Sequence, residues 1–133
     1  MENWGMISFK RHVFLNDPKT TPSELFQRNA RTVAHEVSHM WFGNLVTMDW
    51  WDDLWLNEGF ARYCEHDILN QLRPEFNIWA KYLYQVHNAA VRSDWHLDST
   101  HPIRLPVPEP DQLQSIFDGI SYNKGSAICR MLY

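Results

Sequence analysis

HEVSHMWFGNLVTMDWWDDLWLNEGFA, residues 35–61, holds two short motifs that predict a pair of helices around a metal site. The first motif is H-E-x-x-H, in which His35 and His39 are four positions apart. Four positions on an α-helix make about one turn, so both imidazoles lie on one face and can point at one ion. Glu36 projects beside them, where a carboxylate can hold and deprotonate a metal-bound water.

The second motif, WLNEGFA at residues 55–61, supplies a third ligand in Glu58. Catalytic zinc is held by three protein ligands and keeps a fourth position open. Two antiparallel helices joined by a short loop would bring Glu58 beside His35 and His39, so we expect one Zn²⁺ per chain. The alternatives are two surface histidines and a solvated carboxylate. Glu65, two turns after Glu58, is either a hydrogen-bond acceptor for a ligand imidazole or a surface charge.

Helical patterning is clearest in the segment that carries the first motif. Thr21 is a good N-cap and Pro22 suits the first helical position, which predicts a helix over about 22–42. An apolar stripe through Val33 and Val37 lies on the side of this helix away from the two imidazoles. We expect the stripe to be buried while the ligands face a cleft.

The rest of the chain contains strand, helix and loop signals. Residues 5–15 are rich in β-branched and aromatic side chains, which predicts one or two short strands. Four prolines in residues 97–110 exclude a helix there. Short strands followed by a run of helices indicate a helix-rich α+β fold. The further helices are expected at about 52–71 and 75–94, then from Asp111 to near Gly119, and finally in a segment capped by Ser121.

The composition is that of a folded domain and excludes several classes of function. The 133 residues are 44% hydrophobic and 21% charged. A net charge of −4 and the lack of a basic block argue against a nucleic-acid partner. No apolar run approaches the ~20 residues that span a membrane, and the first residues lack a signal-peptide pattern. Cys64 and Cys129 have no paired spacing and are expected to be free thiols.

Residues 35–61 also resemble the signature of the gluzincin zinc aminopeptidases, the family of aminopeptidase N and puromycin-sensitive aminopeptidase. Three further stretches follow the same family order and extend the likeness over essentially the whole chain. MENWG at residues 1–5 is similar to the end of the GxMEN exopeptidase motif. THPI at 100–103 is similar to the family's SHPI stretch, and FDGISYNKG at 117–125 to the segment with its catalytic tyrosine.

The resemblance implies that residues 1–133 are part of a thermolysin-like zinc metallopeptidase catalytic domain, without the family's N-terminal β domain and C-terminal helical domain. It implies a zinc aminopeptidase that removes N-terminal residues from peptides with a free N-terminus. In that reading Glu36 is the general base and Tyr122 donates a hydrogen bond to the oxyanion. Glu2 binds the α-ammonium group of the substrate. The zinc ligands that it implies are the three already named.

Two positions depart from the family pattern. Ser38 stands where a small residue, often Ala, is usual, and Met40 stands where Gln is usual. Neither is a ligand, so zinc binding is still expected.

A second hypothesis for the function is an inactive zinc-binding fragment that acts as an interaction module. Remaining domains of the parent enzyme are expected partners, and PEFNIW at 74–79 together with IFDGISYNKG at 116–125 favours a cytoplasmic member.

Overall fold

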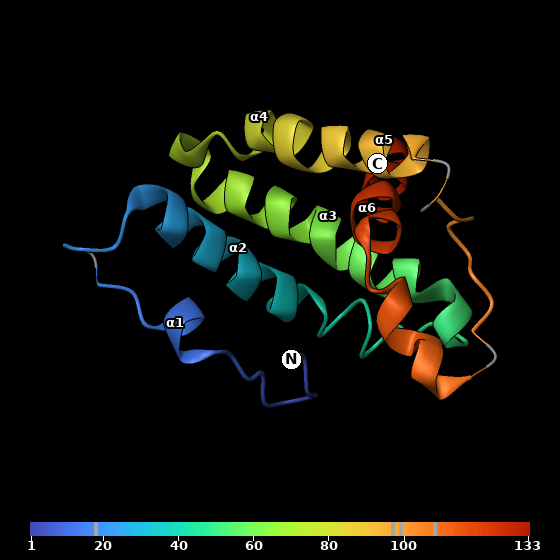
Figure 1. Cartoon of the computed structure of the whole chain (residues 1–133). Helices are drawn as coiled ribbons and strands as arrows, with labels where there is room; N and C mark the ends of the chain where they lie inside the picture. The colour runs from blue at the N-terminus through green and yellow to red at the C-terminus, as the bar shows by residue number, and fades with distance from the viewer. Residues whose placement is uncertain (18, 97, 99, 108) are drawn as a thin grey trace.

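Two antiparallel helices, α2 (Ser23–Ser38) and α3 (Leu54–Leu72), form the centre of the computed structural model (Figure 1). The structure describes residues 1–17, 19–96, 98, 100–107 and 109–133. The other elements are α1 (Arg11–Phe14), η1 (Trp51–Asp53), η2 (Pro74–Phe76), α4 (Ile78–Tyr82), η3 (Leu83–His87), α5 (Asn88–Trp95), η4 (Pro110–Ile116), η5 (Ile120–Lys124) and α6 (Gly125–Leu132).

Helix α2 confirms the strongest helix prediction but begins and ends differently. Its N-cap is Pro22, and the hydroxyl of Thr21, the predicted cap, instead accepts a hydrogen bond from the Asp17 N–H at 3.0 Å. The helix ends at Ser38 because turns lead from there to Gly43, whose φ of +128° favours glycine. The shorter helix leaves a compact loop that returns the chain to α3.

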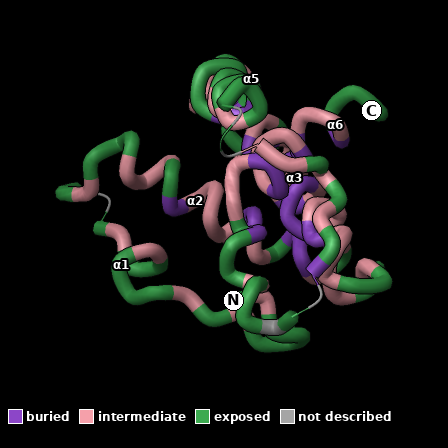
Figure 2. Tube along the Cα trace, turned by 45° about the vertical axis from the view of Figure 1, so that its right-hand side comes forward, coloured by how far each residue is buried: buried purple, intermediate pink, exposed green. Residues whose placement is uncertain are grey.

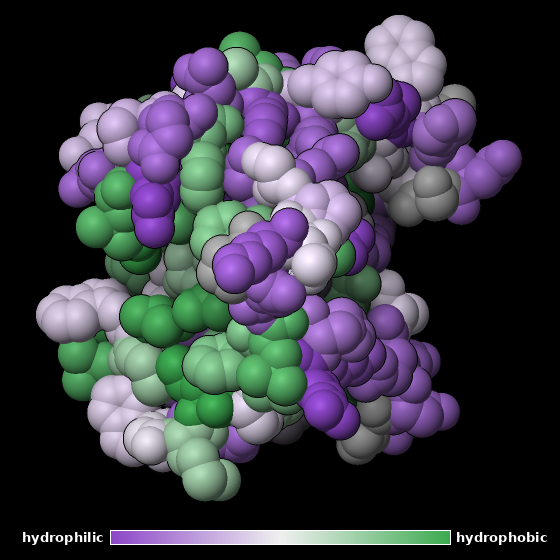
Figure 3. Space-filling model, turned by 90° about the vertical axis from the view of Figure 1, so that its left-hand side faces the viewer, coloured by the Kyte–Doolittle hydropathy of each residue, from purple (hydrophilic) through white to green (hydrophobic). Residues whose placement is uncertain are grey.

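The prediction that the Val33–Val37 stripe would be buried is wrong. Val37 is 49% exposed, whereas His35 and His39 on the other face are buried. Helix α2 packs its histidine face on α3, because α3 carries the acidic partners of those imidazoles. Figure 3 shows hydrophobic residues gathered on the uncovered face. The groove there has a volume of about 410 Å³ and is lined by residues that include Phe26, Val33, Val37, Ile68 and Leu72.

The predicted strands over residues 5–15 are also not observed. Residues 11–14 form the short helix α1, and residues 6–10 have no regular structure. Among the described residues, β pairing is limited to an isolated bridge between Phe42 and Val46. Ser8 exchanges two backbone hydrogen bonds with Met1, at 3.0 and 3.1 Å, but among the described residues this pairing does not extend into the ladder that a strand needs. The helix-rich part of the fold prediction is confirmed.

Helix α3 is the most deeply buried element (Figure 2). Leu54, Ala61 and Leu69 on this helix are at most 6% exposed. Its predicted span of about 52–71 is confirmed. A Cβ on Gly59 would lie 2.7 Å from the backbone of Gly125, so α3 and α6 cross in close contact. Glycine at the crossing lets the two backbones approach.

The helix predicted at about 75–94 is observed as α4, η3 and α5 in direct succession. Ile78, Tyr82, Val86 and Ala90 recur every four residues and are all at most 5% exposed. This spacing forms one apolar face, along which α4 packs on α3 while η3 and α5 pack on η5. No helix in the described part of the chain has the length and apolar character needed to cross a bilayer.

The predicted loop over residues 97–110 is non-helical in its described part up to Glu109, and η1, just before α3, holds it. The backbone carbonyl of Asp52 accepts a hydrogen bond from the Leu105 N–H at 3.1 Å, and its carboxylate accepts one from the Val107 N–H at 2.9 Å. The prediction that Ser121 caps the last helix is wrong. Asp118 caps it, because Asp118 Oδ1 accepts hydrogen bonds from the N–H groups of Ile120 and Ser121 at 2.9 and 3.0 Å.

Candidate metal centre

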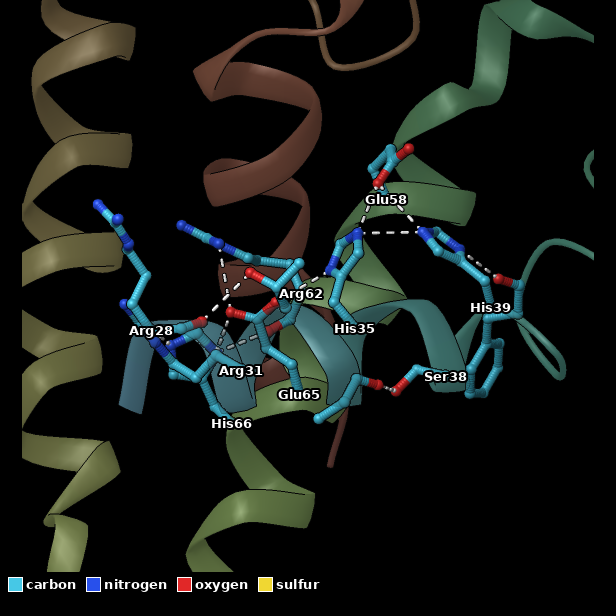
Figure 4. A network of polar contacts seen from close by, with 12 residues as sticks. Arg28, Arg31, His35, Ser38, His39, Glu58, Arg62, Glu65 and His66 are labelled. Atoms are coloured by element: carbon cyan, nitrogen blue, oxygen red, sulfur yellow. Dashed lines mark hydrogen bonds and ion pairs between the residues drawn. The ribbon is translucent and has the colours of Figure 1, made fainter. Parts of the chain in front are cut away.

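Three side chains from two helices point toward one another at the contact of α2 and α3 (Figure 4). The Nε2 atoms of His35 and His39 are 3.0 Å apart. Glu58 Oε2 lies 3.0 Å from the first nitrogen and 3.4 Å from the second. All three residues are buried, and one ligand atom from each lies within 4.8 Å of the others. The tertiary structure thus brings together the residues predicted as ligands.

The spacing of these atoms fits a tetrahedral zinc ion. Ligand atoms about 2.0 to 2.1 Å from tetrahedral zinc lie about 3.3 to 3.4 Å from one another. The three observed separations, 3.0, 3.0 and 3.4 Å, are close to that value. Two imidazole nitrogens and a carboxylate oxygen are also the donor set of catalytic zinc with an open fourth position. The residues present therefore fit this ion.

The pKa values of Glu58 and His35 show that this cluster favours a negative carboxylate beside positive charge. Burial alone would raise the pKa of Glu58, but hydrogen bonds from His35 and His39 lower it to about 2. Burial alone would lower the pKa of His35, but hydrogen bonds to Glu58 and Glu65 raise it to about 9. A buried carboxylate is stable here only beside compensating positive charge. A divalent cation supplies that charge when it displaces the imidazole protons.

Each imidazole is oriented through its other nitrogen. His35 Nδ1 donates to Glu65 Oε2 at 2.9 Å, and His39 Nδ1 donates to the carbonyl oxygen of Phe42 at 3.0 Å. These bonds place the proton on Nδ1, which leaves Nε2 of both rings free to bind a metal. Of the two readings of Glu65, the structure therefore supports the hydrogen-bond acceptor, since its side chain is 2% exposed.

Glu65 is itself held by a buried network. Its Oε1 accepts a hydrogen bond from Arg62 Nη1 at 3.2 Å. His66 is fully buried and donates from Nδ1 to the carbonyl oxygen of Arg62 at 2.7 Å. Burial lowers the pKa of His66 to about 4, so this ring is neutral. The sequence singled out neither Arg62 nor His66, because their positions on α3 have no spacing typical of a ligand.

A cavity of about 690 Å³ opens onto the three ligand atoms. Its lining includes the other residues predicted for the site, Glu2, Glu36 and Tyr122. The Tyr122 ring stacks on His35, with 6.0 Å between ring centroids and an interplanar angle of 16°. Burial, followed by the negative charge of Glu58, raises the pKa of the Tyr122 hydroxyl well above its usual value. This hydroxyl therefore keeps its proton and remains a hydrogen-bond donor.

Glu2, Glu36 and Asn44 line the cavity close to the ends of two distant segments. Glu36 Oε2 lies 2.9 Å from the α-amino group of Met1. The backbone carbonyl of Glu2 accepts a hydrogen bond from Asn44 Nδ2 at 2.7 Å. No sequence motif pointed to Asn44. This bond ties the segment that carries Glu2 to the loop after α2, although the two are far apart in the chain.

The sequence of this chain has many relatives. The model of the peptidase family M1 domain matches residues 1–133. Glutamyl aminopeptidase of Homo sapiens is 49% identical over 132 residues, which are 99% of this chain and 14% of that protein. Leucyl aminopeptidase of Saccharolobus solfataricus is 45% identical over 132 residues, 99% of this chain and 17% of that protein.

A third relative, the tricorn protease-interacting factor F2 of Thermoplasma acidophilum, is 45% identical over 132 residues, again 99% of this chain and 17% of that protein. The chain thus spans only 14% to 17% of the length of these three relatives. The match of the family domain nevertheless extends over every residue of the chain. This chain belongs to peptidase family M1.

Proposed function

We propose that the protein is a zinc aminopeptidase that releases N-terminal residues from peptides. The observation that carries this proposal is the convergence of His35, His39 and Glu58 within 4.8 Å of one another on a cavity that Glu36 and Tyr122 also line. The relatives named as aminopeptidases support the same chemistry. Peptides with a free N-terminus are the proposed substrates, and the remaining domains of the parent enzyme are proposed partners.

The ligand cluster would hold one Zn²⁺, which polarises a carbonyl group and lowers the pKa of bound water toward ~7. Glu36 then accepts the proton of the attacking water and passes it to the leaving amine. Tyr122 donates its hydroxyl hydrogen to the oxyanion that develops on the substrate carbonyl. The raised pKa of Tyr122, which comes first from burial, supports this role because the donor is not lost by ionisation.

Glu2 is the proposed determinant of exopeptidase action. Glu2 belongs to the lining of the same cavity. A carboxylate forms a charge-assisted hydrogen bond with a free α-ammonium group. A blocked N-terminus would leave that carboxylate without a partner and would therefore bind poorly. Hydrolysis would then begin at the first residue of the peptide.

The test compares alanyl substrates that carry a fluorescent leaving group, one with a free amino group and one N-acetylated, together with the zinc content of the full-length protein. We expect stoichiometric zinc and turnover of the free substrate alone. Zinc without turnover would favour the alternative reading, an inactive zinc-binding interaction module. Equal turnover of both substrates would contradict the role of Glu2. The proposed cytoplasmic location is tested separately by cell fractionation.

A further inference from the structure

Tyr122 lies on a helical segment whose beginning is fixed by a pair of side chains outside the metal centre. The segment consists of η5 (Ile120–Lys124) and α6 (Gly125–Leu132). Asp118 Oδ1 accepts hydrogen bonds from the N–H groups of Ile120 and Ser121, and the Asp118 carbonyl accepts one from the Tyr122 N–H at 3.1 Å. One aspartate thus sets the orientation of the turn from which the Tyr122 side chain projects.

The other carboxylate oxygen of Asp118 is bound by a histidine from the proline-rich loop. His101 Nε2 donates to Asp118 Oδ2 at 2.7 Å, and His101 Nδ1 lies 2.7 Å from the carbonyl oxygen of Pro102. The histidine side chain is 16% exposed and the aspartate side chain 29% exposed, so solvent reaches the pair only in part. A charge-assisted bond of this length restricts the rotation of the Asp118 carboxylate.

Neighbouring contacts hold both members of the pair against α5 (Asn88–Trp95). Thr100, the residue before His101, donates its hydroxyl to Asp94 at 3.2 Å. Lys124, at the end of the Tyr122 turn, binds the same oxygen of Asp94 at 2.7 Å. A Cβ on Gly119 would lie 2.6 Å from Ser93 Oγ, so the beginning of the segment packs directly on α5. The turn is therefore held at both ends.

We propose that His101 is a positioning residue for Tyr122 that acts through Asp118. This inference rests on the proposed role of Tyr122 as the donor to the oxyanion. With His101 in place, the Asp118 carboxylate keeps both backbone N–H groups of the turn, and the Tyr122 ring stays stacked on His35. Without His101, the carboxylate rotates into solvent, the first turn of the segment opens, and the hydroxyl loses its fixed place. Geometric displacement of a single donor is enough to lower the rate of a reaction.

The test is a double-mutant cycle in the full-length, zinc-loaded protein. His101→Ala is expected to lower kcat about tenfold with KM changed less than twofold, and Tyr122→Phe to lower kcat about 100-fold. In the Tyr122→Phe background, His101→Ala should add less than a twofold loss, since its effect passes through the missing hydroxyl. His101→Gln retains one N–H donor and is expected to recover most of the activity.

A second measurement does not depend on activity. Amide hydrogen exchange in the zinc-free protein should become at least tenfold faster over residues 117–124 in His101→Ala and stay unchanged in α3. If Tyr122→Phe retains full activity, the proposed function of Tyr122 fails and the inference fails with it. If Tyr122→Phe loses activity while His101→Ala does not, only the inference is overturned. An equal loss from His101→Ala in both backgrounds would show a general structural role and would also overturn it.

Discussion

The carboxylate of Glu65 lies 2.9 Å from Nδ1 of His35 and fixes the ring so that Nε2 faces Glu58. Glu58 and Glu65 are both on α3, two turns apart, and both contact the same imidazole through opposite nitrogens. Helix α3 therefore supplies a ligand and also the acceptor that orients a ligand of α2. Removing either carboxylate should affect the metal centre, but in different ways.

Glu65→Gln should weaken zinc binding about 10- to 100-fold, because the orienting carboxylate raises the basicity of His35 and fixes its tautomer. Zinc affinity is measured by competition with a coloured chelator. Glu75→Gln is the matched control, since Glu75 is exposed and forms an ion pair with Arg73 at 3.5 Å. Equal zinc affinity of the wild-type protein and Glu65→Gln would contradict the role of this carboxylate.

Removal of metal should lower both activity and thermal stability. A ligand that binds only the native state stabilises it, by about 2.7 kcal/mol at a concentration 100 times its Kd. We expect the Tm to fall after dialysis against 1,10-phenanthroline and to recover when Zn²⁺ is added. Glu58→Ala, which lacks one ligand, should show little recovery. A Tm that zinc leaves unchanged in the wild-type protein would argue against a metal at this centre.

Glu36→Gln should lower kcat by about 100- to 10,000-fold, the usual contribution of a general base. Zinc content should stay at the wild-type level, because Glu36 is absent from the group of three potential ligands. Activity is measured with the free alanyl substrate, and zinc by atomic absorption. A variant that retains its zinc and its activity would exclude Glu36 as the base, whereas loss of zinc would place this residue among the ligands.

Gly43→Ala should destabilise the protein and weaken zinc binding together. A Cβ at this position would lie 2.1 Å from Asn57 Oδ1 and 3.2 Å from His39 Nδ1, and the φ of +128° is strained for alanine. We expect a loss of about 2 to 4 kcal/mol in the free energy of unfolding, measured by denaturant titration.

Gly5→Ala is the matched control for this prediction. Gly5 also has a positive φ, +81°, but no atom of the described residues lies within 4 Å of the Cβ that alanine would add. It should therefore cost about 1 kcal/mol of backbone strain and leave zinc affinity unchanged. If the two substitutions changed zinc affinity to a similar extent, the contact of position 43 with Asn57 and His39 would not be what controls zinc affinity.

Local periodicity in the amino-acid sequence was enough to predict the spacing of the two histidines and the extent of the long helices. The one-turn separation of His35 and His39 is fixed by helix geometry wherever the helix lies. The extent of α3 and of the helix from Ile78 to Trp95 follows from apolar spacing and from the prolines that flank or exclude helices. The placement of Glu58 as a third ligand was also expected, because the short connection between α2 and α3 leaves few ways to pack them.

Contacts between segments that are distant in sequence determine which face of each helix packs against another helix. Val37 remains half exposed because the buried polar bonds of His35 and His39 turn the opposite face of α2 toward α3. Residues 6–10 form no strand because pairing depends on a neighbour and not on β propensity alone. Asp118, and not Ser121, caps the last helix because His101 and the backbone of the turn converge on its carboxylate. Such contacts join residues that are distant in sequence, so no local pattern predicts them.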